Sequence, residues 1–218
     1  MRKTLLGAAV LVLALQGCSA ADDPSGAGPA PSSAVPSSPL TAEASATSGI
    51  GGAPPPAGAL DGKRQVFLLP RIDDNELPDS VLAVTPSGRI QVTDDYADRA
   101  LFVPVPRGGG AKERLIKTGT LRSAGEPFCL EVSGNGTDPL TVVTAACDAG
   151  EPAQLFTFEA VGKDGDGQTT YSVRNRDAFL QWHPLGGIGL IAEELGDSAL
   201  ETTFALRDQG PAALPAED

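Results

Sequence analysis

The chain holds few of the side chains that catalysis usually requires. Its 218 residues include one histidine, His183, and no Gly-x-Ser-x-Gly elbow that would expose a nucleophilic serine. A Ser-His-Asp hydrolase of the elbow type needs both features. The acidic pairs Asp94-Asp95 and Glu193-Glu194 could suggest glycosidase chemistry, but neighbouring residues of a strand point to opposite faces. We therefore expect a protein that is not an enzyme and that uses no cofactor.

The acidic residues do not predict a metal site either. The run Lys-Asp-Gly-Asp-Gly at 163–167 begins like a calcium loop, yet it lacks the later Asp and the bidentate Glu of such a loop. Glycine readily supplies the positive φ angle that tight hairpins need. The run is therefore expected to form a hairpin turn with no metal bound.

The first of the three cysteines, Cys18, ends a segment with the pattern of an export signal. Basic residues begin this segment, and an apolar run over 5–15 follows that is too short to span a bilayer. Residues 15–19, Leu-Gln-Gly-Cys-Ser, resemble the lipobox of bacterial lipoproteins, in which the cysteine is acylated and becomes the new N-terminus. The alternative is an ordinary signal peptide that happens to contain a cysteine. The resemblance implies a signal peptide over 1–17, lipid on Cys18, and an exported protein anchored on the outer face of the cell membrane.

Composition divides the rest of the chain. Residues 18–60 are dominated by Ala, Pro, Ser and Gly and contain no aromatic residue, which is typical of a disordered linker. All aromatic residues lie after position 66, so we expect one folded domain over 61–210 and a flexible tail over 211–218. The net charge of -12 argues against a nucleic-acid partner and against adsorption to anionic lipid.

The two remaining cysteines are expected to pair. Once Cys18 is assigned to lipid, Cys129 and Cys147 form an even pair in an oxidising compartment, which favours a disulfide. A metal site built on the two thiols is the weaker alternative, because the chain offers one histidine and no further thiol to complete a zinc shell.

Short apolar strands separated by Gly, Pro and Asp turns indicate an all-β domain, and these strands recur. One strand pattern occurs at 81–84, 129–132 and 179–182, with starts 48 and 50 residues apart. A phenylalanine that ends a polar loop recurs at separations of 54 and 48 residues, as Phe102, Phe156 and Phe204. Two landmarks with a common period predict a threefold arrangement.

The middle segment resembles a repeat of the ricin B-type lectin domain. The resemblance is carried by Phe-Cys-Leu-Glu-Val at 128–132, Gly-Asn-Gly at 134–136, Cys-Asp-Ala-Gly at 147–150 and Gln-Leu-Phe at 154–156. In that family the strand usually reads Cys-Leu-Asp-Val, its cysteine is bonded to the second cysteine, and a Gln-x-Trp element closes the repeat. The resemblance implies a β-trefoil of twelve strands, with a six-stranded barrel closed by three hairpins and with the three phenylalanines in the shared core.

The same resemblance implies carbohydrate binding. Sugar pockets of the family use a carboxylate from the first strand, an aromatic ring before the second cysteine, and an Asn beside the Gln-x-Trp element. The middle repeat keeps Glu131 and Gln154 but has Ala145 at the ring position and Ala153 at the Asn position. The other two repeats have Ala83 and Gln181 at the carboxylate position, and Trp182 is expected in the core rather than on a platform.

The candidate sugar-binding residues are therefore Glu131, Asn135 and Gln154. The alternative is that Glu131 and Gln154 satisfy local backbone groups in a structural repeat. A second class of function is a protein-interaction module, because the order of lipobox, linker and degenerate trefoil resembles the A subunit of cytolethal distending toxins. The ligand expected first is a glycan.

Overall fold

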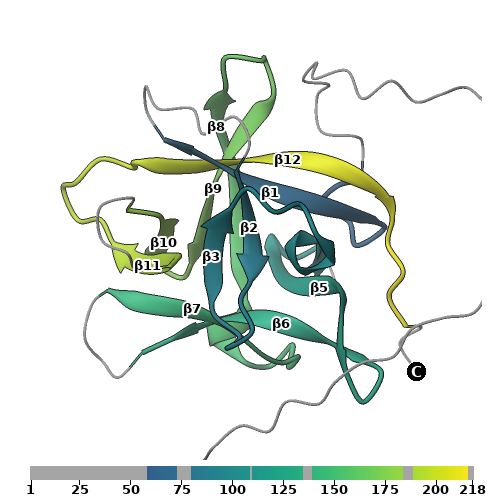
Figure 1. Cartoon of the computed structure of the whole chain (residues 1–218). Helices are drawn as coiled ribbons and strands as arrows, with labels where there is room; N and C mark the ends of the chain where they lie inside the picture. Colours follow the sequence, from purple (N-terminus) through teal and green to yellow (C-terminus); the bar gives the residue numbers. More distant parts are fainter. Residues whose placement is uncertain (1–57, 73–79, 109, 135–138, 184–188, 216–218) are drawn as a thin grey trace, which may run out of the picture. The chain divides into compact units, whose positions relative to one another are not determined.

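The described part of the chain is almost entirely β-structure (Figure 1). The computed structural model describes residues 58–72, 80–108, 110–134, 139–183 and 189–215. Within these ranges no helix has the length and apolar character needed to cross a membrane. The strands are β1 (Arg64–Ile72), β2 (Val81–Val84), β3 (Ile90–Thr93), β4 (Phe102–Pro106), β5 (Glu113–Ser123), β6 (Glu126–Ser133), β7 (Leu140–Ala146), β8 (Phe156–Lys163), β9 (Thr169–Asn175), β10 (Ala178–Gln181), β11 (Ile191–Glu194) and β12 (Thr202–Pro211), and the short 3-10 helices are η1 (Asp98–Ala100) and η2 (Pro152–Gln154).

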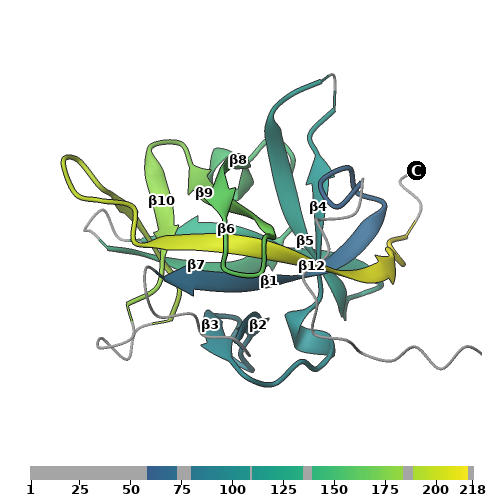
Figure 2. The same cartoon turned by 90° about the horizontal axis from the view of Figure 1, so that it is seen from above.

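Six of these strands close a barrel. The antiparallel pairings run from β1 to β4, β5, β8, β9 and β12, and then from β12 back to β1. Figures 1 and 2 show β1 and β12 lying along one another at the seam where the ring closes. A closed ring leaves no barrel strand with an unpaired edge.

The other six strands form three hairpins, β2–β3, β6–β7 and β10–β11. Each hairpin contacts the other two through the backbone. Arg89 pairs with Val143, Ile191 pairs with Thr141, and the Leu190 amide donates to the Ile90 carbonyl at 2.9 Å. These contacts join the hairpins into one cap with threefold pseudosymmetry.

Twelve strands arranged as a six-stranded barrel and three hairpins make a β-trefoil. The sequence prediction of this fold is confirmed. Its three repeats run over β1–β4, β5–β8 and β9–β12, and the recurring strand pattern coincides with β2, the second half of β6, and β10. Ala59 is buried in the core, and the Ala212 amide donates to the Lys63 carbonyl at 2.8 Å.

The three repeats contribute equivalent phenylalanines to one core. Phe102, Phe156 and Phe204 are each 0% exposed and belong to the same cluster of buried side chains. This placement confirms the core role that the resemblance to a lectin repeat implied for them. Trp182 is partly buried against the same cluster, as expected of a core residue.

Two ion pairs connect β1 to segments that are distant in sequence, one to β12 and one to the turn between β8 and β9. The Arg64 guanidinium binds Asp208 of β12, with Nε 2.8 Å from Oδ1, and this hydrogen bond holds the pKa of the Asp208 carboxyl below its usual value. The Arg71 Nε lies 3.0 Å from Asp164 Oδ2, and the two side chains are only 9% and 3% exposed.

Asp164 Oδ1 accepts from two backbone amides of its own turn, which closes with Gly167 at a φ of 78°. The run 163–167 is the hairpin turn that was expected.

The predicted disulfide between Cys129 and Cys147 is present. It connects β6 to the residue that follows β7, and the bonded sulfurs are therefore not ligands of a metal ion. Cys129 is fully buried against Leu115 and Leu155, whereas Cys147 is partly buried.

Loss of this bond is expected to lower stability under oxidising conditions. In the Cys147→Ala variant, removal of a bridge between residues 18 positions apart should cost about 3 kcal/mol, because the unfolded chain regains the entropy of the open loop. Thermal unfolding with and without reductant measures this effect. The variant and the parent should unfold alike once the parent is reduced. An equal difference in both conditions would assign the loss to packing instead of the bridge.

Candidate functional site

Two of the three predicted sugar-binding residues lie together in the middle repeat. Glu131 is on β6 and Gln154 is in η2, and the Gln154 amide donates to the Glu131 carboxylate at 3.0 Å. Asn135 lies outside the described residues, as does Cys18, the predicted site of lipidation. Of the predicted sugar-binding residues, the structure therefore describes Glu131 and Gln154. It also describes the predicted disulfide.

The Gln154 side chain is turned into the protein. It is 2% exposed, its nitrogen also donates to the Ala146 carbonyl at 2.8 Å, and its oxygen accepts from the Asp148 amide at 2.9 Å. These bonds tie the end of β7 to η2. Of the two side chains, Glu131 is the one that is partly exposed and offers a polar group to the surface.

The other repeats use the same positions for structure. In the third repeat the Gln181 side chain is 0% exposed, and its oxygen accepts from the amides of Glu201 at 3.2 Å and Thr202 at 3.0 Å. In the first repeat the corresponding residues, Ala83 and Ala100, are buried and apolar. Gln181 is the equivalent of Glu131, so in the third repeat this position binds backbone amides of the protein.

The remaining positions of the family's sugar pocket carry methyl groups. Ala145 lies opposite Cys129 in the β6–β7 pairing, and Ala153 is in η2, where its amide donates to the Glu151 side chain at 3.1 Å. A methyl group can neither cover the face of a pyranose nor orient a hydroxyl. The middle repeat thus retains the carboxylate of such a pocket without its ring and its amide.

The single histidine contacts two acidic side chains. The His183 Nε2 lies 3.0 Å from Glu193 Oε1, and its Nδ1 lies 3.5 Å from Glu201 Oε2. Within the part of the chain that the structure describes, both ring nitrogens of His183 therefore lie near carboxylates. That the protein is not an enzyme stays a prediction.

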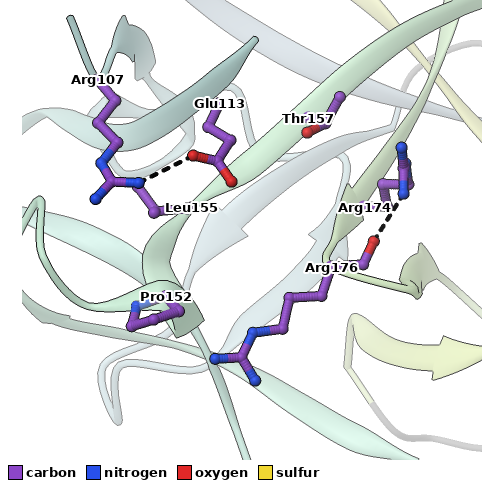
Figure 3. Close-up of a pocket in the computed structure, with 7 residues that line it drawn as sticks. All are labelled: Arg107, Glu113, Pro152, Leu155, Thr157, Arg174 and Arg176. Atoms are coloured by element: carbon purple, nitrogen blue, oxygen red, sulfur yellow. Dashed lines mark hydrogen bonds and ion pairs between the residues drawn. The ribbon is translucent and has the colours of Figure 1, made fainter. Parts of the chain in front are cut away.

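A concave site with different chemistry lies on the outer side of the barrel. Figure 3 shows this arginine cleft, which has a volume of about 380 Å³. A row across three paired strands forms one wall, because Glu113 of β5 lies opposite Thr157 of β8, and Thr157 lies opposite Arg174 of β9. The residues that line the cleft are Arg107, Glu113, Pro152, Leu155, Thr157, Arg174 and Arg176.

Positive charge dominates the arginine cleft. Three guanidinium groups surround it from different sides and one carboxylate faces them, although the chain as a whole carries a net charge of -12 (Figure 3). Arg107 Nη1 lies 3.1 Å from Glu113 Oε2, and these side chains are 44% and 45% exposed. Arg174 Nη1 donates to the Arg176 carbonyl at 2.9 Å. The cleft can therefore attract a negatively charged group that the rest of the surface repels.

The floor of the cleft is fixed by a buried amide. Asn175 is 5% exposed, and its Nδ2 donates to the Pro152 carbonyl at 2.7 Å and to the Leu155 carbonyl at 2.8 Å. These bonds hold η2 against the end of β9. Pro152 and Leu155, the two apolar residues of this floor, therefore lie next to Arg174 and Arg176 of the third repeat.

Comparisons with known proteins find similar solved structures but no matching family model and no matching curated protein. The BEL β-trefoil is 14% identical, with 66% of this chain and 93% of that chain covered and a TM-score of 0.47. The cytolethal distending toxin of Haemophilus ducreyi is 14% identical, with coverage of 71% and 87% and a TM-score of 0.46. That of Actinobacillus actinomycetemcomitans is 15% identical, with coverage of 75% and 99% and a TM-score of 0.45. The β-trefoil assignment itself rests on the strand pairings given above.

Sequence reasoning missed the arginine cleft. Its charged residues are distant in sequence, and the net charge of -12 gives no sign of a local excess of positive charge. The signal that could have found it is the strand register. Once β5, β8 and β9 are taken as barrel neighbours, Glu113, Thr157 and Arg174 fall on one row.

Proposed function

We propose that this protein is an exported, lipid-anchored recognition protein whose β-trefoil domain binds carbohydrate at the outer face of the cell membrane. The lipobox-like segment supports the anchoring, and the likeness of the middle repeat to ricin B-type lectin repeats supports the ligand class. The linker over 18–60 holds the domain at a distance from the membrane.

The observation that carries the choice of ligand is the polar character of the described surface. Among the residues that the structure describes, Val161 is the single large hydrophobic side chain that is exposed, at 49%. Stable protein interfaces are usually centred on buried aromatic and apolar side chains. A glycan instead needs closely spaced hydrogen-bonding groups. The surface therefore favours a glycan over the alternative of a protein-interaction module.

The middle repeat offers one residue for this role. Glu131 is partly exposed, and its carboxylate is oriented by the Gln154 amide. A carboxylate held in one orientation accepts hydrogen bonds from sugar hydroxyls without first losing side-chain freedom. Glu131 is thus the group through which this repeat contacts a sugar, and Gln154 positions it.

A glycan array with the full chain in detergent tests the proposal. We expect retention on one or more glycans, and the Glu131→Gln variant should lose at least about tenfold in this retention, because a hydrogen bond to a charged acceptor is lost. Glutamine keeps an oxygen that can accept from the Gln154 amide, so the variant should melt at the parent temperature. A co-purified protein partner with no retention on any glycan would overturn the proposal in favour of the interaction module.

A further inference from the structure

We propose that the arginine cleft is a second ligand site and that it binds a negatively charged sugar, one that carries a carboxylate group. This inference rests on the proposed function for its ligand class, carbohydrate. It adds a site that is separate from Glu131 and that selects for charge.

The first support is the excess of positive charge among the side chains that line the cleft. Arg107 is paired with Glu113, whereas the Arg174 guanidinium donates to a neutral carbonyl. Among the described residues no hydrogen bond or ion pair reaches the Arg176 guanidinium. Two cations that line one cleft without a carboxylate partner repel one another, and an anion between them removes that repulsion. The planar guanidinium matches the two oxygens of a carboxylate or a sulfate.

The second support is the backbone at Arg176. This residue lies in the tight turn between Asn175 and Ala178, and its φ of 53° is in the left-handed region. Residues other than glycine, asparagine and aspartate rarely occupy that region, because their Cβ atoms are crowded there. Ala124 in the equivalent turn between β5 and β6 has a φ of 52°, so the hairpin geometry of these turns sets this φ. An arginine in place of the usual turn residue presents a guanidinium at the edge of the cleft.

The other lining groups suit the neutral part of a sugar. The Thr157 hydroxyl can donate or accept, and the Glu113 carboxylate can accept from ligand hydroxyls. Pro152 and Leu155 offer an apolar floor for the C–H face of a pyranose ring. The volume of about 380 Å³ is in the range of small-molecule sites and exceeds what an isolated inorganic anion needs.

The charge of the whole chain limits what the cleft can bind. A polyanion such as nucleic acid would extend from the cleft over a surface with a net charge of -12, where its further phosphates are repelled. Adsorption to anionic lipid head groups is disfavoured for the same reason. A short ligand with one or two negative groups places all of its charge within the cleft.

The test is a titration of the full chain with glucuronate, N-acetylneuraminate, galactose and inorganic sulfate, followed by calorimetry. We expect one or both acid sugars to bind at the cleft more tightly than sulfate and galactose, and to bind more weakly as salt is added. Arg174→Gln and Arg176→Gly should each weaken this binding at least about tenfold, because a charge-assisted hydrogen bond is lost.

The variants are chosen so that misfolding cannot explain the loss. Glycine at 176 relieves the left-handed strain, so the Arg176→Gly variant should melt at the parent temperature or above it. Arg89→Gln makes the same change of charge at an exposed residue outside the cleft, and it should bind the acid sugar like the parent.

The outcomes separate this inference from the proposed function. Retention of neutral glycans without binding of either acid sugar would overturn the cleft site and leave carbohydrate recognition standing. Binding of sulfate as tight as that of the acid sugars would reduce the cleft to an anion site and overturn its role as a sugar site. Equal loss of acid-sugar binding in Arg89→Gln and Arg174→Gln would attribute the attraction to general charge and contradict the inference.

Discussion

The Phe156→Ala variant is expected to lose about 3–5 kcal/mol of the free energy of unfolding. Phe156 is 0% exposed, it begins β8, and it lies opposite Arg114 of β5 in the barrel. Its side chain belongs to the same buried cluster as those of Phe102 and Phe204. Because the barrel is a closed ring, the surrounding strands cannot collapse into the cavity that alanine leaves, so most of the lost packing remains lost.

Urea denaturation of a matched series measures this effect. Phe102→Ala and Phe204→Ala should lose a similar amount, since the three residues are equivalent in the pseudosymmetric core. Phe179→Ala is the control, because that ring lies on β10 and is partly exposed, and it should lose clearly less. A loss at Phe156 no larger than the loss at Phe179 would contradict the common core of the three repeats.

The Arg71→Ala variant is also expected to lose about 3–5 kcal/mol of the free energy of unfolding. Its guanidinium lies 3.0 Å from the Asp164 carboxylate, and both side chains are almost completely buried. Removing the arginine leaves a buried carboxylate without its counter-charge, which costs much more than the pair itself contributes. The pair also joins β1 of the first repeat to the turn between β8 and β9, so its loss loosens that turn.

A surface ion pair of the same chain provides the control for Arg71. Lys63 Nζ lies 3.8 Å from Asp61 Oδ2, with side chains that are 81% and 43% exposed. Lys63→Ala should change the free energy of unfolding by less than about 1 kcal/mol, because water screens an exposed pair. Chemical denaturation of both variants gives the comparison. Similar losses at Arg71 and Lys63 would show that the Arg71–Asp164 pair is accessible to water.

The fold could be predicted because its determinants recur along the chain. Phe102, Phe156 and Phe204 keep nearly one spacing, and the strand before each of them repeats with the same period. Burial of an apolar residue at each equivalent position is what a threefold core requires. The Cys129–Cys147 bond was predictable for a different reason, since only two cysteines remained once Cys18 was assigned to lipid.

The candidate site was predicted less well, because its contacts depend on strand register and on side-chain direction. The resemblance to a lectin repeat singled out Glu131 and Gln154, and the alternative expected them to satisfy local backbone groups, as Gln154 does at Ala146; the bond between the two side chains was not predicted. Arg71 and Asp164 are 93 residues apart, and no local pattern connects them. The arginines of the cleft come from different repeats and become neighbours only when the barrel is closed.

The pairing of β1 with β12 has a consequence for the folding of the chain. The bond between Arg64 and Asp208 joins residues 144 positions apart. During synthesis, β1 can therefore pair with β12 only after nearly the whole chain has been made. Contacts of such long range slow folding. A truncated product that lacks β12 leaves the long edges of β1 and β9 exposed, and such edges promote aggregation. Premature termination near the C-terminus should therefore yield insoluble protein instead of a shortened but functional domain.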